Sequence, residues 1–69
     1  MRITVNGKAV ESKDNITVTE LLVEQKAQTP EYVSVELNGE ILNREDFPTT
    51  IVSDGDVAEF LYYMGGGAI

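Results

Sequence analysis

The sequence predicts an α+β fold in which one main helix packs on a mixed sheet of four to five strands. Two observations lead to this prediction. Alternating apolar residues run into an Asn-Gly pair twice, over residues 2–7 and 32–39, a pattern typical of β-hairpins. Between them, residues 17–22 combine a capping motif with a short amphipathic stripe, which indicates a helix. The 69 residues are enough for one domain only.

The first hairpin is expected over residues 2–12. Ile3 and Val5 share one face of its first strand, and Asn6-Gly7 supplies the positive φ angles of a two-residue turn. The return strand, residues 8–12, is only weakly apolar. We therefore expect it to be short and to lie at an edge of the sheet.

The helix is expected to begin after Thr17. In a capping box, the Thr17 hydroxyl and the Glu20 carboxylate satisfy free backbone amides at the start of the helix. Val18, Leu21 and Leu22 follow at spacings of three and four residues, which gives one buried stripe. The pattern predicts that the helix ends near residues 27–29, before a proline.

The second hairpin is expected to start with a strand over residues 32–37, in which Val33, Val35 and Leu37 share one face. Asn38-Gly39 forms its turn, and residues 40–42 return.

A polar crossover over residues 43–48 is expected to hold one helical turn, with Phe47 directed inward. After a tight turn at Asp54-Gly55-Asp56, residues 57–63 form the last and most apolar strand. A right-handed crossover through the helix makes the first and last strands parallel neighbours. The predicted architecture is therefore a β-grasp (ubiquitin-like) domain over residues 1–64.

Residues 65–69 are expected to form a flexible C-terminal arm. Three successive glycines lose the most backbone entropy on ordering and contribute no side chains that could pack.

Composition excludes several classes of function. The chain has no Cys and no His, so we expect no disulfide, no metal site and no catalysis that depends on an imidazole or a thiolate. Twelve acidic against five basic residues give a net charge of −7, which opposes nucleic-acid binding. No apolar run reaches the roughly 18 residues of a membrane span. A cytoplasmic protein that binds neither nucleic acid nor membrane is expected.

Two acidic clusters have alternative interpretations. Asp54-Gly55-Asp56 begins like a calcium-binding loop, but the remaining ligand positions are missing, which favours a turn. Glu45-Asp46 is a pair of carboxylates without any pattern that indicates burial, which favours a solvated surface.

The last strand predicts a partner interface. If Ala58, Phe60 and Tyr62 face the helix, the opposite face presents an apolar and aromatic stripe that only Glu59 interrupts; its members are Val57, Leu61 and Tyr63. The alternative is that a loop covers this face, or that the register is reversed.

Several segments spread over nearly the whole chain have a familiar order: Thr17-Val18, Glu20-Leu21-Leu22, Val35 to Ile41, Arg44-Glu45, Asp54-Gly55-Asp56 and the terminal glycines. In these segments the chain resembles the sulfur-carrier proteins of thiamine biosynthesis, the ThiS family, with MoaD proteins as more distant relatives. Gly67 follows Asp56 by 11 residues, the distance at which such carriers end.

The resemblance implies a function for the arm. A ubiquitin-activating-like adenylyltransferase would use ATP to adenylate Gly67, and sulfur would then replace the adenylate to give a thiocarboxylate. Gly65 and Gly66 would form the slim arm. No cofactor would stay bound to the carrier, and thiazole synthase or another sulfur-acceptor enzyme would take the sulfur.

Ala68 and Ile69 extend past this functional terminus. Similarity to processed carriers implies that a trimming metalloprotease removes them. Three alternatives stay open: a carrier for cysteine, homocysteine or another sulfur-containing product, a ubiquitin-like protein modifier, and a plain binding module.

Overall fold

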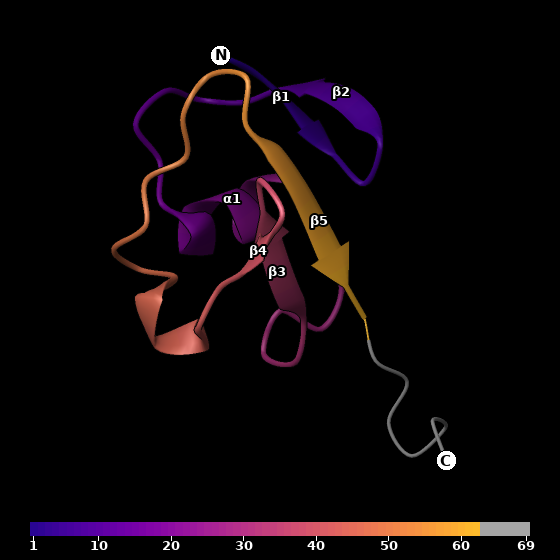
Figure 1. Ribbon diagram of the computed structural model, residues 1–69, viewed down its shortest axis with the longest axis vertical. Helices are drawn as coiled ribbons and strands as arrows, with labels where there is room; N and C mark the ends of the chain where they lie inside the picture. Colours follow the sequence, from indigo (N-terminus) through magenta and orange to yellow (C-terminus); the bar gives the residue numbers. More distant parts are fainter. Residues whose placement is uncertain (63–69) are drawn as a thin grey trace.

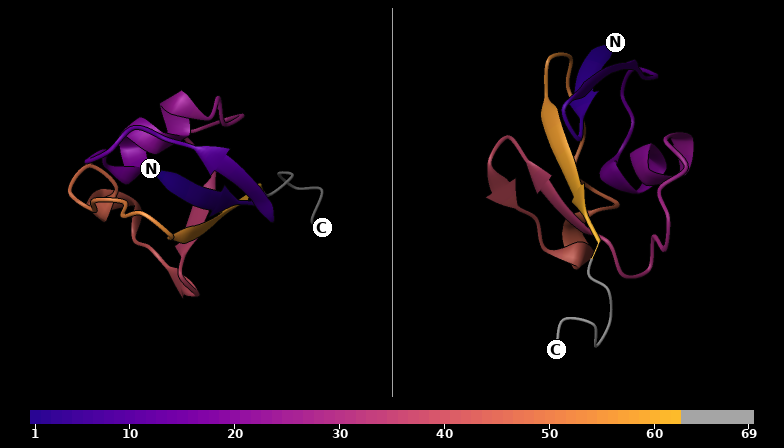
Figure 2. Two further views of the ribbon diagram at one scale, coloured as in Figure 1. Left: turned by 90° about the horizontal axis from the view of Figure 1, so that it is seen from above. Right: turned by 90° about the vertical axis from the view of Figure 1, so that its right-hand side faces the viewer.

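The computed structural model of the protein describes residues 1–62. Within them, five strands form one sheet in the order β2-β1-β5-β3-β4, and the helix α1 (Val18–Glu24) lies against one of its faces (Figures 1 and 2). The strands are β1 (Arg2–Val5), β2 (Lys8–Glu11), β3 (Ser34–Leu37), β4 (Glu40–Ile41) and β5 (Val57–Leu61). β1 and β5 are parallel, and the other neighbours are antiparallel. The predicted mixed sheet and β-grasp architecture are confirmed.

Both Asn-Gly turns have the predicted conformation. Asn6 and Gly7 have φ angles of 51° and 83°, and Asn38 and Gly39 have φ angles of 51° and 88°. The registers follow directly, because the residues that flank each turn are paired across the hairpin. β2 lies at an edge of the sheet, as its weak apolar pattern predicts.

The helix begins as predicted. The Thr17 hydroxyl accepts a hydrogen bond from the Glu20 N–H at 3.1 Å, and the Glu20 carboxylate accepts one from the Thr17 N–H at 2.8 Å. This reciprocal capping box fixes the first turn. The three stripe residues Val18, Leu21 and Leu22 are all buried.

The end of the helix differs from the prediction. α1 ends at Glu24 rather than near residues 27–29, because Lys26 adopts a left-handed φ of 55°. The Lys26 N–H donates to the Val23 carbonyl at 3.1 Å, and the Ala27 N–H donates to the Leu22 carbonyl at 2.9 Å. This is a Schellman motif, which usually has Gly at its left-handed position. Because Lys26 rather than a glycine occupies this position, the sequence does not indicate that the helix ends here.

The core lies between α1 and the inner face of the sheet, and the crossover closes it. Phe47, directly after the 3-10 turn over Arg44–Asp46, is buried as predicted. Within residues 1–62, the other buried apolar residues are Ile3, Ile16, Val18, Leu21, Leu22, Val33, Val35, Val52, Ala58 and Phe60. No helix among residues 1–62 is both long and apolar enough to cross a membrane.

The two longest predicted strands are shorter in the structure. β3 begins at Ser34, because the Val33 N–H donates to the Thr29 carbonyl in a preceding turn. β5 ends at Leu61, which pairs with Ser34, so the ladder has no partner residue beyond it. Tyr63, the predicted end of this strand, lies outside the described residues.

Candidate functional site

The predicted sulfur-carrying arm follows the central strand of the sheet. β5 lies between β1 and β3, so the arm is attached to the best supported strand of the domain. The structure does not describe the predicted arm and extension, whose residues are Gly65, Gly66, Gly67, Ala68 and Ile69. Tyr63 also lies outside the described residues. What the structure describes is the platform from which they extend.

The two hairpin turns hold β5 through their asparagine side chains. The Asn6 side-chain oxygen accepts a hydrogen bond from the Phe60 N–H at 2.8 Å. The Asn38 side-chain oxygen accepts one from the Val57 N–H at 2.9 Å. Sequence analysis assigned the asparagines only a turn conformation. Their second role depends on which strand lies beside the turns, and no local pattern encodes that.

The acidic turn before β5 is structural. The Asp54 carboxylate accepts from the Arg2 N–H at 2.8 Å, and the Asp56 carboxylate accepts from the Ser53 N–H at 2.8 Å. The Asp56 carboxylate also accepts from the Asn38 side chain at 3.0 Å. These bonds confirm the turn interpretation. Within residues 1–62, no group of three or more acidic, His or Cys side chains is placed to hold a metal ion.

The two faces of β5 differ as the alternation predicts. Ala58 and Phe60 are 0% and 6% exposed on the inner face, whereas Val57 is 46% exposed on the outer face and Leu61 is half-buried. Tyr62 is more exposed than expected for a residue facing the helix, but its hydroxyl accepts from the Gln28 N–H at 3.3 Å. An interface at Val57 and Leu61 remains a prediction.

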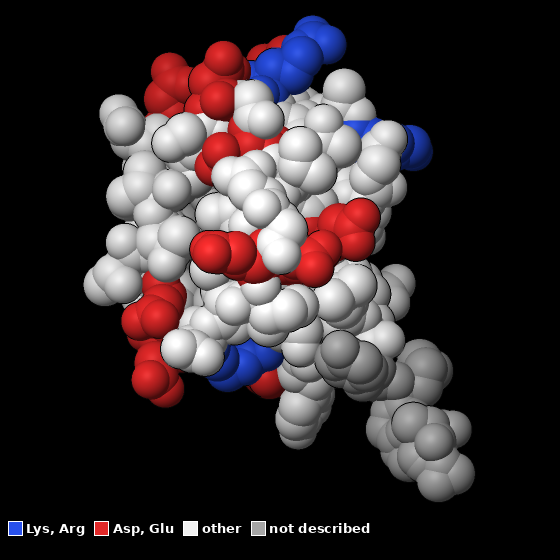
Figure 3. Space-filling model, viewed as in Figure 1, with Lys and Arg blue, Asp and Glu red and all other residues white. Residues whose placement is uncertain are grey.

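The strand register pairs acidic residues on this outer face. Glu59 on β5 lies directly opposite Glu36 on β3, and Glu36 lies opposite Ile41 on β4, whose side chain is exposed. Like charges directly opposite each other destabilise a sheet. Figure 3 shows this face: acidic side chains gather across its middle, and basic ones lie toward its margins. Sequence analysis missed the Glu36–Glu59 pair. Ile41 could have been placed from the Asn-Gly turn, which fixes the register of β4.

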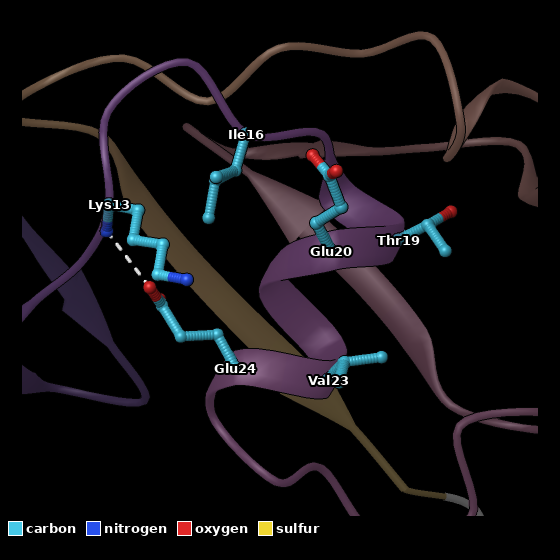
Figure 4. Close-up of a pocket in the computed structure, with 6 residues that line it drawn as sticks. All are labelled: Lys13, Ile16, Thr19, Glu20, Val23 and Glu24. Atoms are coloured by element: carbon cyan, nitrogen blue, oxygen red, sulfur yellow. Dashed lines mark hydrogen bonds between the residues drawn. The ribbon is translucent and has the colours of Figure 1, made fainter.

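A hollow of about 370 Å³ lies on the solvent side of α1 (Figure 4). The Lys13 N–H donates to the Glu24 carboxylate across it at 2.8 Å, and the exposed Val23 forms part of its rim. Burial alone would raise the pKa of Glu24, but hydrogen bonds from the Lys13 N–H and the Gln25 side chain hold this pKa below its usual value. Glu24 therefore stabilises the connection between β2 and α1.

Known proteins match the chain in both sequence and fold. The ThiS family matches residues 2–67, which is nearly the whole chain. The chain belongs to the ThiS family. The sulfur carrier protein ThiS of Bacillus subtilis (strain 168) is 35% identical over 66 residues, which cover 94% of this chain and 98% of that protein.

Two solved structures support the same assignment. The crystal structure of a thiamine biosynthesis protein (ThiS) from Geobacter metallireducens has a TM-score of 0.85 and 56% identity, and the match covers 97% of this chain and 100% of that chain. An NMR solution structure of a thiamine biosynthesis protein from the same organism has a TM-score of 0.78 and 55% identity, covering 100% and 91%. The β-grasp platform is thus that of the ThiS family.

Proposed function

We propose that this member of the ThiS family carries sulfur for thiamine biosynthesis as a thiocarboxylate at Gly67. It serves other enzymes as a co-substrate and is not itself a catalyst. The observation that carries the proposal is the extent of the family match. It runs from residue 2 to Gly67, the last of three consecutive glycines, and leaves Ala68 and Ile69 outside.

The chemistry needs only the backbone terminus. A carboxylate is a poor electrophile, so a ubiquitin-activating-like adenylyltransferase joins the Gly67 carboxylate to the AMP part of ATP and releases pyrophosphate. Sulfide then attacks the acyl carbon, and AMP leaves with the bonding electron pair. One oxygen is exchanged for sulfur, and no oxidant or reductant is required. A chain without His or Cys can be the substrate of both steps.

The residues beside Gly67 suit a narrow active site. Gly65 and Gly66 add no side chain that would obstruct a channel. Ala68 and Ile69 would place the carboxylate about 7 Å beyond Gly67 at the extended rise per residue. A metalloprotease therefore removes them before activation, and thiazole synthase is the proposed sulfur acceptor.

The test compares two chain lengths. The chain ending at Gly67 and the chain ending at Ile69 are each incubated with the adenylyltransferase of the source cell, ATP and sulfide. Intact-protein mass spectrometry should show one oxygen replaced by sulfur only in the shorter chain. Gly67→Asp in the shorter chain should abolish the exchange and leave the circular dichroism spectrum unchanged. Thiocarboxylate on the Ile69 form would show that trimming is unnecessary, and isopeptide conjugates to other proteins would indicate a modifier instead.

We also propose that the outer face of β5 docks on the activating enzyme, through Val57 and Leu61 together with Tyr63. Val57 is exposed and lies on the strand that leads into the arm. Val57→Asp should weaken binding by about 2 kcal/mol, or roughly 30-fold, as is common for central apolar anchors. The matched control is Val23→Asp, which changes an exposed valine on α1.

Titration calorimetry with the adenylyltransferase measures both valine variants. If Val57→Asp and Val23→Asp bind the adenylyltransferase with equal affinity, the outer face of β5 is not the docking surface. Rising salt should slow association if the acidic residues around Val57 attract a basic surface.

A further inference from the structure

A groove of about 420 Å³ lies where the β1–β2 hairpin meets the end of α1. Its apolar lining comes from both layers and includes Val5, Val10, Ala27 and Phe60. Tyr62 also lines it, and the Tyr62 hydroxyl accepts a hydrogen bond from Gln28, another lining residue. The described chain therefore ends, at Tyr62, on the wall of this groove.

The groove is cationic in an acidic protein. Lys8 and Lys26 are the charged residues in its lining, and no Asp or Glu lines it. Within residues 1–62, neither lysine takes part in an ion pair, whereas the Arg2 guanidinium lies 3.2 Å from the Glu11 carboxylate. With a net charge of −7, most of the protein surface repels an anion. The groove is a local exception.

We propose that this groove receives the chain's own glycine arm, and that Lys8 and Lys26 bind the anionic end group at Gly67. The inference rests on the proposed function, which places a carboxylate and later a thiocarboxylate there. Residues 63–67 span at most roughly 17 Å. Because Tyr62 already lines the groove, this length suffices to turn back into it, and the glycines allow the turn.

The tether makes a weak contact effective. Exposed ion pairs are individually weak, and free molecules would not associate through them. The arm is part of the same chain, so its end group is present at an effective concentration of roughly millimolar or more. Docking through two such pairs is then a minority state that reverses easily and that a covalent cross-link can trap.

Zero-length cross-linking tests the contact without ATP or any partner enzyme. A carbodiimide condenses a carboxylate with an amine that touches it. In the chain ending at Gly67, peptide mapping of the monomer should find Gly67 joined to Lys8 or Lys26, and not to Lys13, which lies in the separate hollow on α1. Lys8→Gln with Lys26→Gln should remove these cross-links. Lys13→Gln, the matched control, should leave their yield unchanged.

Amide chemical shifts provide the second measurement. The double Lys→Gln variant should shift the Gly66 and Gly67 amides toward random-coil positions, while the amides of β3 and β4 stay in place and report an intact fold. Equal cross-linking of Gly67 to Lys13, or no change in the glycine shifts, would overturn the proposal. A partner enzyme that binds the double variant more weakly while these shifts stay unchanged would also overturn it, because the groove would then hold a partner. Thiocarboxylate formation can succeed or fail independently of these readouts.

Discussion

The inner and outer faces of β5 differ in what determines their residues. On the inner face, Ala58 and Phe60 are buried against the layer formed by α1, so packing determines their size and polarity. On the outer face, Glu59 lies directly opposite Glu36, an arrangement that opposes folding. Replacing either glutamate would stabilise the sheet, so stability alone does not account for this pair. The difference indicates that the inner face serves the fold and that the outer face serves another purpose.

The largest expected effect comes from the inner face. Phe60→Ala should lower the free energy of unfolding by about 3–5 kcal/mol, because it leaves a cavity in a small core. Domains of this kind have only about 5–15 kcal/mol in total, so the melting temperature should fall steeply. Val57→Thr on the outer face should stay within about 0.5 kcal/mol. Urea unfolding of both variants checks the contrast, and similar losses at the two positions would contradict it.

The inner face was predictable because its signals are local. Alternation in β3 and β5, two Asn-Gly pairs and the Thr17–Glu20 capping box each act within a few residues, and all were confirmed. The Glu36–Glu59 pair was not predictable in the same way. Its register joins strands separated by a long crossover, so it depends on tertiary structure. The groove between the hairpin and α1 also combines distant segments.

The candidate site also has parts that could be predicted from local sequence signals and parts that could not. The sequence placed the glycines directly after the last strand, and alternation placed Val57 and Leu61 on one face of it. It did not reveal that Asn6 and Asn38 hold that strand, because both residues have a sufficient local role as turn formers. The left-handed Lys26 carries no sequence signal, since glycine usually fills its position.

The next largest effect concerns the hydrogen bond between the Asn6 side chain and β5. Asn6→Gly retains a residue that tolerates the φ of 51° but removes the oxygen that accepts from the Phe60 N–H. Leaving this partly buried donor unsatisfied should cost about 1–3 kcal/mol. Asn6→Asp, which keeps an acceptor and tolerates the same conformation, is the control. Hydrogen exchange at the Phe60 amide should accelerate in the glycine variant alone; equal exchange in both variants would show that the bond does not hold β5.

A smaller effect separates stability from binding on the outer face. Glu36→Gln or Glu59→Gln should raise the free energy of unfolding by about 0.2–1 kcal/mol, because either change removes the like-charge contact. The double variant should gain less than the sum of the two single changes. Affinity for the activating enzyme should fall in each single variant if the acidic pair faces a basic partner. Variants that become more stable without losing affinity would show that this pair has no part in docking.

The smallest expected effect lies in the layer that covers the inner face. Hydrogen bonds from the Lys13 N–H and the Gln25 side chain outweigh burial and lower the pKa of Glu24 in the folded state. The resulting stabilisation is present above the ordinary pKa of a glutamate in the unfolded chain, and it is lost as the pH falls through the lower folded value. Glu24→Gln should therefore be slightly less stable than the wild type near neutral pH, and the two unfolding curves should converge in acid. The difference between the two proteins isolates Glu24 from the other carboxylates. A constant difference across the acidic range would mean that the ionised form of Glu24 makes no special contribution to the connection between β2 and α1.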